Sequence, residues 1–340
     1  MPGTHEALQY EKLPEGAVRC SLCNQRCTIR EGKHGICTVR VNRGGTLYAT
    51  TYGMVTSEAI DPIEKKPLYH YLPGTQCYSL GCVGCNFHCE HCQNWHISRA
   101  TAGDLNLTEL PPEKAVERAV NTGCASIAWT YNEPTIWHEY ALDMGILARQ
   151  KHLGTVYVTN GYITEEALRE LAPMLGAYRV DIKAFNDNFY RSVCGGSLQP
   201  VLDSTALARE LGMHVETVTL VIPGLNDAAE EIDGLIRWVV EHLGPDTPMH
   251  FTRFHPDYRM QDRGPTPVET LEKIYLRAKE LGIRFPYVGN VFNHRYEHTY
   301  CPVCGALLIE RAGYSVQVRN LEQGRCRVCG EVIAYVSKVG

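Results

Sequence analysis

The stretch Cys85-Asn-Phe-His-Cys89-Glu-His-Cys92 places three cysteines in the pattern CxxxCxxC on one short loop. It follows an apolar segment at residues 78–80, and the neighbouring Gly84 lets the backbone wrap closely around a bound group. Three thiolates can bind three irons of a [4Fe–4S] cubane, which leaves the fourth iron open. An open iron can chelate a cofactor, much as a catalytic zinc keeps one free coordination position. The loop therefore predicts an iron–sulfur cluster with an exchangeable site.

Strands and helices alternate along the chain from about residue 71 to 290. Helix starts are indicated at Pro112 and after Thr164, and residues 266–281 have the pattern of an amphipathic helix. Strands spaced by roughly 25–45 residues indicate βαβ units in a parallel sheet. About six such units suit an α/β fold of the barrel or partial-barrel type. The expected strands are 78–80, 126–129, 155–158, 178–182, 214–222, 249–251 and 284–288.

Polar and reactive residues come directly after these strands. In barrels of parallel strands, function sits at the carboxyl ends of the strands. That position also bears on the central loop, whose spacing alone would fit a structural zinc or a cluster closed by Cys82 or Cys77. The position of this loop directly after the first strand favours a cluster with one open iron over a closed site. The residues that directly follow an expected strand are Cys85, Glu133, Asn160, Lys183, Pro223-Gly224 and His255.

The segment 1–70 carries a second cysteine group and is expected to be a small metal-stapled module. A hairpin is indicated around Gly44-Gly45. Four thiolates can close a zinc site or an auxiliary [4Fe–4S] cluster, and spacing does not separate the two. The four candidate ligands are Cys20, Cys23, Cys27 and Cys37.

The segment 291–340 carries two CxxC pairs, each followed by glycine. Four thiolates in this arrangement typically give tetrahedral zinc, so a C-terminal zinc ribbon is predicted. A rubredoxin-like iron site is the alternative. The zinc would stabilise the fold of this segment, which is too small to bury a hydrophobic core of its own. The ligands would be Cys301, Cys304, Cys326 and Cys329.

Bulk composition narrows the functional class. The 340 residues are 44% hydrophobic, with a formal net charge of −5 at pH 7, and this balance gives no electrostatic footprint for nucleic acid. The sequence contains no run of about 20 apolar residues that could span a membrane. Residues 1–12 lack the apolar core of a secretory signal, so we expect a cytoplasmic protein. In that setting, clustered cysteines indicate metal ligands rather than disulfides.

Longer motifs around the loop resemble one known family. Asp61-Pro-Ile-Glu-Lys-Lys-Pro-Leu-Tyr-His70, Gly84-Cys-Asn-Phe and Cys92-Gln-Asn-Trp-His-Ile-Ser98 are similar to the radical S-adenosylmethionine (SAM) enzyme of the AmmeMemoRadiSam system. That family is related to pyruvate formate-lyase activating enzymes. The resemblance covers nearly the whole chain. One position departs from the superfamily pattern, because His91 stands where Phe or Tyr is usual; a flat ring is retained.

The resemblance implies a radical SAM partial (β/α)6 barrel of TIM type and a set of SAM-binding residues. A carboxylate after the second strand would hold the amino group of SAM through a charge-assisted hydrogen bond. Residues after the third to fifth strands would line the rest of the SAM pocket. The implied cofactor-binding residues are Tyr131, Asn132, Glu133, Asn160, Asp181, Lys183 and Ile222, and the implied substrate-side catalytic residues are Tyr131, Arg253 and His255.

The resemblance also implies the chemistry. A reduced cluster would cleave SAM to methionine and a 5′-deoxyadenosyl radical, which abstracts hydrogen from a small-molecule or protein substrate. The implied partners are an electron donor such as flavodoxin or ferredoxin and other proteins of the AmmeMemoRadiSam system. Activation of a glycyl-radical enzyme is an alternative. An alternative from another class is a non-catalytic zinc-ribbon protein that binds RNA or acts as a scaffold.

Overall fold

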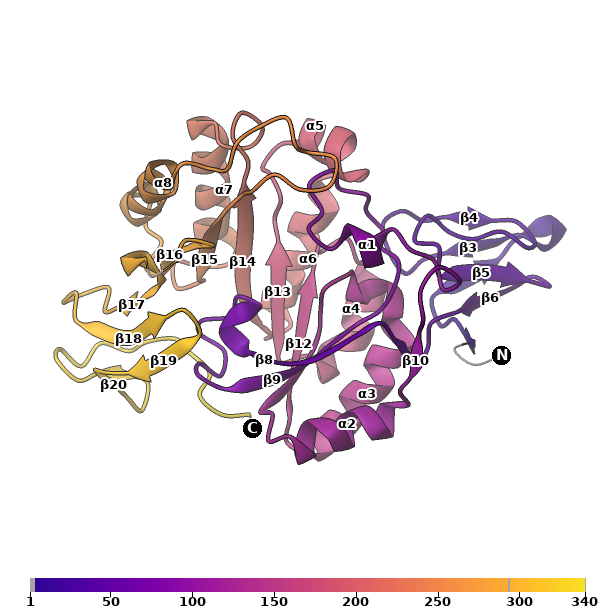
Figure 1. Ribbon diagram of the computed structural model, residues 1–340, viewed down its shortest axis with the longest axis horizontal. Coiled ribbons are helices and arrows are strands. Elements are labelled where there is room, and N and C mark those ends of the chain that lie inside the picture. The colour runs from indigo at the N-terminus through magenta and orange to yellow at the C-terminus, as the bar shows by residue number, and fades with distance from the viewer. Residues whose placement is uncertain (1–3, 293, 340) are drawn as a thin grey trace.

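The computed structural model describes residues 4–292 and 294–339, and one eight-stranded sheet forms its centre (Figure 1). Its strands are β8 (Ser57–Pro62), β9 (Gln76–Gly81), β11 (Ser126–Trp129), β12 (Gly154–Thr159), β13 (Ala177–Asp181), β14 (His214–Val221), β15 (Met249–Arg253) and β16 (Pro286–Gly289). The order across the sheet is β16-β15-β14-β13-β12-β11-β9-β8. All neighbours pair in parallel except β8, which is antiparallel to β9.

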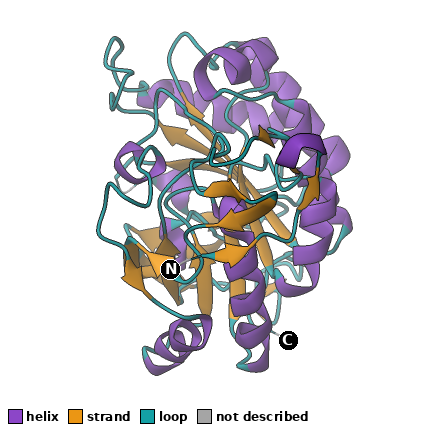
Figure 2. Cartoon of the chain, turned by 90° about the vertical axis from the view of Figure 1, so that its right-hand side faces the viewer, coloured by secondary structure: helices purple, strands orange, loops and turns teal. Residues whose placement is uncertain are grey.

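Helices connect each parallel strand to the next, and most of them lie to one side of the strands (Figure 2). The longer ones are α2 (Pro112–Asn121), α3 (His138–Gln150), α4 (Glu165–Leu171), α6 (Gln199–Glu210), α7 (Ala229–His242) and α8 (Val268–Glu280). Strands β16 and β8 lie at opposite edges of the sheet, which is therefore an open barrel. This confirms the α/β partial barrel. Within the described residues, no helix combines the length and apolar character needed to cross a membrane.

The strand and helix signals of the sequence correspond to elements of the structure. All seven expected strands are present, with end shifts such as β16 beginning at Pro286 rather than at residue 284. Thr164 caps α4 as expected, because its hydroxyl accepts a hydrogen bond from the Ala167 backbone N–H. Strand β8 was not expected. It belongs to the central sheet although it lies within residues 1–70, so the sheet begins before the predicted module boundary.

The N-terminal residues form two small three-stranded sheets at one end of the molecule (Figure 1). One contains β2 (Tyr10–Lys12), β3 (Val18–Cys20) and β4 (Thr28–Ile29). The other contains β1 (His5–Glu6), β6 (Thr46–Ala49) and β5 (Arg40–Arg43). The predicted hairpin joins β5 to β6 through Gly44 and Gly45, whose φ angles of 62° and 73° are those of a tight hairpin turn.

The C-terminal ribbon lies at the other end of the molecule, beside β16 (Figure 1). Its strands are β17 (Thr299–Tyr300), β18 (Leu307–Ala312), β19 (Ser315–Val318), β20 (Leu321–Glu322) and β21 (Arg325–Cys326). Leu308 and Ile309 share one apolar cluster with Tyr69 and Tyr287 of the barrel. The buried guanidinium of Arg311 donates to the Tyr69 carbonyl at 3.0 Å. The ribbon is thus docked on the barrel by both apolar and polar contacts.

Candidate functional site

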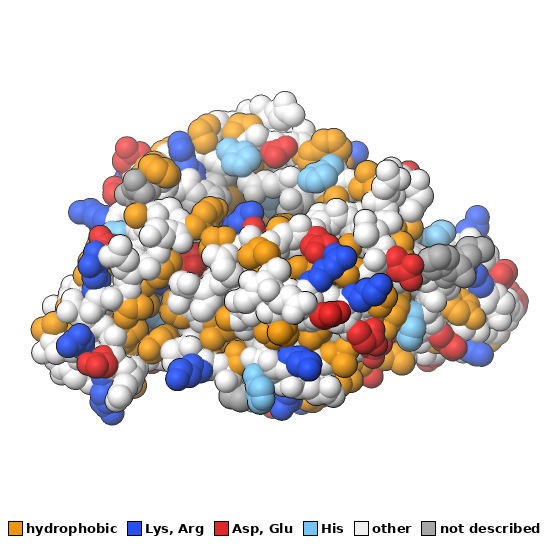
Figure 3. All heavy atoms as spheres, turned by 60° about the horizontal axis from the view of Figure 1, so that its bottom comes forward, with side chains coloured by type: hydrophobic (Ala, Val, Ile, Leu, Met, Phe, Trp, Pro, Cys, Tyr) orange, Lys and Arg blue, Asp and Glu red, His pale blue; other side chains and the backbone are white. Residues whose placement is uncertain are grey.

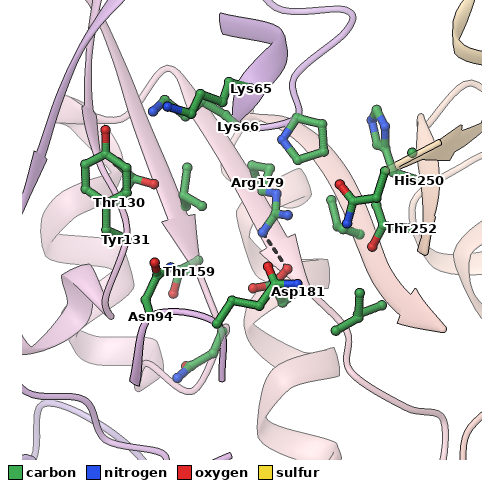
Figure 4. A pocket seen from close by; sticks show the side chains of 18 of the residues that line it. Lys65, Lys66, Asn94, Thr130, Tyr131, Thr159, Arg179, Asp181, His250 and Thr252 are labelled. Carbon is green, nitrogen blue, oxygen red and sulfur yellow. Dashed lines mark hydrogen bonds and ion pairs between the residues drawn. The ribbon is translucent and has the colours of Figure 1, made fainter. Parts of the chain in front are cut away.

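A cavity of about 920 Å³ lies at the carboxyl ends of the parallel strands (Figure 4). This volume is at the upper end of the range of ligand pockets, which leaves room for a cofactor and a substrate together. Side chains from β12, β13, β14 and β15, from the loops after β9 and β11, and from the 64–69 segment line it. Six of the predicted cofactor-binding residues line the cavity: Tyr131, Asn132, Glu133, Asn160, Asp181 and Lys183.

Cys85, Cys89 and Cys92 all line this cavity. Cys77 and Cys82 are buried and are not among the residues that line it, so neither is placed as a fourth ligand at the cavity. Three thiols that share a wall with a large space fit a cluster with one open iron. Burial raises the pKa of Cys85 well above its ordinary value, because a thiolate is unfavourable here without a compensating charge. A bound iron would supply that charge and stabilise the thiolate.

The cysteine loop is held in place by a segment that the sequence analysis left without a role. The backbone N–H groups of His88 and Glu90 donate to the carbonyls of Cys194 and Val193, at 2.9 and 3.1 Å. A Cβ atom at Gly195 would lie 2.1 Å from the His88 ring, so only glycine permits this approach. The Gly195-Gly196 pair was the available sequence signal.

His91 also lines the cavity, as its place in the resemblance suggested. Its ring is buried and lies 5.8 Å from the ring of Phe189, centroid to centroid. Burial lowers the pKa of His91 to about 3, so the ring is neutral at physiological pH. A neutral flat ring can pack as Phe or Tyr would.

Glu133 is buried and joins the ends of β11 and β12. Its carboxylate accepts hydrogen bonds from the Thr159 hydroxyl at 2.7 Å, the Asn160 N–H at 2.7 Å and the Thr135 N–H at 2.9 Å. Burial raises the pKa of Glu133, against these hydrogen bonds. A carboxylate offers about four acceptor positions, so three protein donors leave about one for a ligand ammonium. The role of Glu133 in SAM binding stays a prediction. Its hydrogen bonds show that it holds the ends of β11 and β12 together.

The two asparagines of the predicted site hold the cysteine loop. Asn160 Nδ2 donates to Asn86 Oδ1 at 2.8 Å. Asn132 accepts from the Cys82 N–H at 3.1 Å and donates to the Gly84 carbonyl at 3.0 Å. Both side chains therefore tie the loop to the ends of neighbouring strands. Their contact with a cofactor remains a prediction.

Tyr131 has a left-handed backbone, with φ of 73°, and its hydroxyl donates to Asp61 at 2.5 Å. Asp61 also accepts from Lys65 and Lys66, each at 2.7 Å. Burial alone would raise the pKa of Asp61, but these three hydrogen bonds outweigh it and hold that pKa well below its usual value. Lys65 and Lys66 lie above Tyr131 at the cavity (Figure 4). Sequence reasoning missed both lysines, because the 61–70 motif served only as a mark of resemblance.

Asp181 lies at the end of β13, and Figure 4 shows its ion pair with Arg179. It pairs with Arg179 and, at 3.4 Å, with Lys183. Burial alone would raise the pKa of Asp181, but the charges of Arg179 and Lys183 outweigh it and lower that pKa. The group therefore carries one net positive charge at the cavity wall, which suits an anionic part of a ligand.

Three predicted residues do not line the cavity. Ile222 is buried, and its N–H donates to Asn226. Arg253 donates to the Thr266 carbonyl at 2.8 Å, and His255 is exposed. On β15, His250 and Thr252 line the cavity instead.

The displacement of Arg253 has a simple physical reason. Successive side chains of a strand point to opposite faces, so residues 250 and 252 share one face and residue 253 takes the other. The sequence prediction selected Arg253 as the last residue of the strand and did not account for this alternation of side chains.

Glu216 anchors the wall that carries His250. It is fully buried on β14 and accepts from the His214 and His250 rings, at 2.9 and 2.7 Å. It also accepts from the backbone N–H groups of Tyr69 and His70, at 3.0 and 2.7 Å. Burial alone would raise the pKa of Glu216, but the hydrogen bonds from the two histidines hold it well below its usual value. One carboxylate thus fixes the 64–70 segment and His250 together.

The C-terminal cysteines form a compact group. The sulfur atoms of Cys301 and Cys329 are 3.6 Å apart, and those of Cys304 and Cys326 are 3.7 Å apart. All four lie within 4.8 Å of one another. Four thiolates at about 2.3 Å from one tetrahedral ion would be separated by about 3.8 Å. The group therefore could hold a single metal ion, as the zinc-ribbon prediction requires.

Comparisons with known proteins point to one family. Residues 80–239 match the family described as the Radical SAM superfamily. An uncharacterized protein of Methanocaldococcus jannaschii is 47% identical over 333 residues, which cover 97% of this chain and 99% of that protein. An isethionate sulfite-lyase activating enzyme of Oleidesulfovibrio alaskensis is 29% identical over 111 residues, 32% of this chain and 36% of that protein.

One solved structure extends the likeness of fold. The crystal structure of a radical SAM methyltransferase from Sphaerobacter thermophilus superposes with a TM-score of 0.52 and 15% sequence identity. It covers 85% of this chain and 77% of that one. At this identity the similarity concerns the fold alone.

Proposed function

The chain belongs to the radical SAM superfamily, and from that premise we propose that it cleaves SAM reductively at a [4Fe–4S] cluster on Cys85, Cys89 and Cys92. When bound, the cluster supplies one electron that breaks the S–C5′ bond of SAM, giving methionine and a 5′-deoxyadenosyl radical that abstracts hydrogen from a substrate. The observation that carries the proposal is the shared cavity. It brings three thiols and six predicted cofactor-binding residues to one cavity.

The protein's own residues bind and orient the cofactor in this proposal. The ammonium of SAM takes the remaining acceptor position of Glu133, and the Arg179–Asp181–Lys183 group attracts the anionic carboxylate. Buried walls exclude water, which protects a radical from side reactions. The substrate would share this cavity, whose lining includes Lys65, His250 and, from the turn between β18 and β19, Tyr314, so a substrate with polar groups is favoured.

Partners follow from the same proposal. We propose that a flavodoxin- or ferredoxin-type protein delivers the electron. The 61–98 motifs that resemble the AmmeMemoRadiSam enzyme support a role alongside the other proteins of that system.

Anaerobic assay tests the central step. Reconstituted protein incubated with dithionite and SAM should form 5′-deoxyadenosine, and Cys89→Ala should abolish it. Cys124→Ala is the matched control, because Cys124 is a buried thiol that is not among the residues lining this cavity. Continued deoxyadenosine formation by Cys89→Ala would show that the cluster is assigned to the wrong cysteines. Deuterium transfer from candidate substrates into deoxyadenosine then identifies the hydrogen donor.

Activation of a glycyl-radical enzyme is a second candidate, supported by the partial match to an isethionate sulfite-lyase activating enzyme. Its readout is the electron paramagnetic resonance (EPR) signal of a glycyl radical on an added partner.

An RNA-binding scaffold is less well supported. Basic and acidic side chains are intermixed on the face drawn in Figure 3, which therefore lacks the continuous basic track that suits a phosphate backbone. A colourless protein that carries only zinc after reconstitution would favour the scaffold.

A further inference from the structure

The four N-terminal thiols surround a second, small cavity. Cys20, Cys23, Cys27 and Cys37 all line it. Much of the remaining wall is apolar and comes from Leu22, Ile29, Ile36 and Ile136. Three of the cysteines are less than 9% exposed. Four thiols around one largely apolar space favour a metal site over separate free thiols.

The spacing of these thiols separates a cluster from a single ion. Among the described residues, only the C-terminal cysteines bring three or more ligand atoms within 4.8 Å of one another. In any set of three N-terminal thiols, at least one pair is therefore more than 4.8 Å apart, whereas the thiolates on one tetrahedral ion would be about 3.8 Å apart. Cys85, Cys89 and Cys92 show the same wider spacing. In a cubane each thiolate binds a different iron, so the sulfur atoms are necessarily spread.

Unsatisfied donors at the same cavity need an acceptor. Arg40 Nε and Asn86 Nδ2 are buried N–H groups without a hydrogen-bond partner, and both residues line the cavity. Buried donors in native proteins are nearly always paired. The sulfur atoms of an iron–sulfur cluster accept such hydrogen bonds. The other nitrogens of Arg40 are already engaged by Glu139, at 2.6 and 2.7 Å, which leaves Nε for the cavity.

This second site touches the central cysteine loop. A Cβ atom on Gly84 would lie 2.5 Å from the Cys37 carbonyl oxygen, so the two backbones are in direct contact. Gly84 is bonded to Cys85, a ligand of the central cluster. Gln25 Nε2 also donates to the Asn86 carbonyl at 2.8 Å. Gly84 is therefore the one residue between Cys37 of the N-terminal site and Cys85 of the central site.

We propose that Cys20, Cys23, Cys27 and Cys37 hold a second [4Fe–4S] cluster, closed by four cysteines, in contact with the central cluster through Cys37, Gly84 and Cys85. Its four irons are all ligated, so it binds neither SAM nor substrate. The contact with the central cluster rests on the proposed function, whereas the identity of the second metal does not.

Metal analysis of a variant that lacks the central ligands tests this. The Cys85→Ala/Cys89→Ala/Cys92→Ala variant, purified and reconstituted anaerobically, should retain about four irons and four sulfides per chain. Its reduced EPR signal should be unchanged by SAM. The C-terminal ribbon serves as an internal reference, with about one zinc in every variant. About two zincs and no iron in the triple variant would overturn the proposal.

The full-length wild-type protein supplies the second measurement, which holds even if the triple variant fails to fold. It should bind about eight irons, and SAM should alter the EPR signal of only one of two clusters. When both are reduced, their spins should interact and broaden the spectrum. About four irons, all in a SAM-sensitive cluster, would overturn the proposal. Failure of SAM cleavage with eight irons bound would instead count against the proposed function alone.

Discussion

Substitution of Gly84 by alanine tests the contact between the two cysteine sites most directly. Gly84 has φ of 87°, and its new Cβ would meet the Cys37 carbonyl oxygen at 2.5 Å. Ordinary van der Waals contact begins at 3.4 Å, so the two backbones must separate by about 0.9 Å. Left-handed backbone costs a non-glycine residue about 1–2 kcal/mol, and overpacking of a core typically costs about 1–3 kcal/mol more. The total expected loss of unfolding free energy is about 2–5 kcal/mol.

Gly212→Ala is the matched control. Gly212 has nearly the same φ, 84°, but a Cβ atom there meets nothing within 4 Å. It should lose only the conformational part, about 1–2 kcal/mol. Urea unfolding of both reconstituted variants under anaerobic conditions measures the difference, and iron analysis reports whether the cysteine sites still load. Equal unfolding midpoints with full iron content in both variants would refute the claimed contact between Cys37 and Gly84.

Three further predictions concern charge and metal. Glu139→Gln leaves the buried Arg40 without a carboxylate and should cost about 3–5 kcal/mol in unfolding free energy; a loss under 1 kcal/mol contradicts this. The charge of Arg40 outweighs burial and lowers the pKa of Glu139 to about 2. The stabilisation from this pair is therefore present above about pH 4.5 and is lost as the pH falls toward 2. The Glu139→Gln variant should not show this loss of stability in acid. Lys183→Met should weaken SAM binding by about tenfold or more in anaerobic calorimetry, since a charged hydrogen bond is worth about 1.5–3 kcal/mol; an unchanged Kd refutes its placement. Cys304→Ala should remove one bound metal ion per chain without loss of iron, and loss of iron instead would contradict the assignment.

The architecture was largely predictable because its signals are local. Buried parallel strands are continuous apolar runs, and β11 shows this clearly, with all four residues buried. The edge strand β8 is different. All but one of its residues are partly or fully exposed, Glu58 among them, and its pairing with β9 depends on a contact that no local pattern encodes.

The cavity was predictable to the level of strand ends and no further. Cys85, Glu133 and Lys183 come together at the cavity because a parallel sheet gathers the carboxyl ends of its strands. The hydrogen bonds of Glu133 with Thr159 and Asn160 were not predictable, since they join residues on different strands. The same holds for the spacing of the N-terminal thiols, which depends on the fold of the whole module.

The ribbon has a consequence for the open edge of the barrel. An uncovered edge strand presents free N–H and C=O groups that can recruit another chain into a growing sheet. Tyr287 of β16, the last strand of the sheet, is buried against Leu308 and Ile309 of the ribbon. Loss of the C-terminal metal would loosen that cover. The four C-terminal thiols would then help to keep the protein in solution, because chains that lack the metal should expose β16 and aggregate through it.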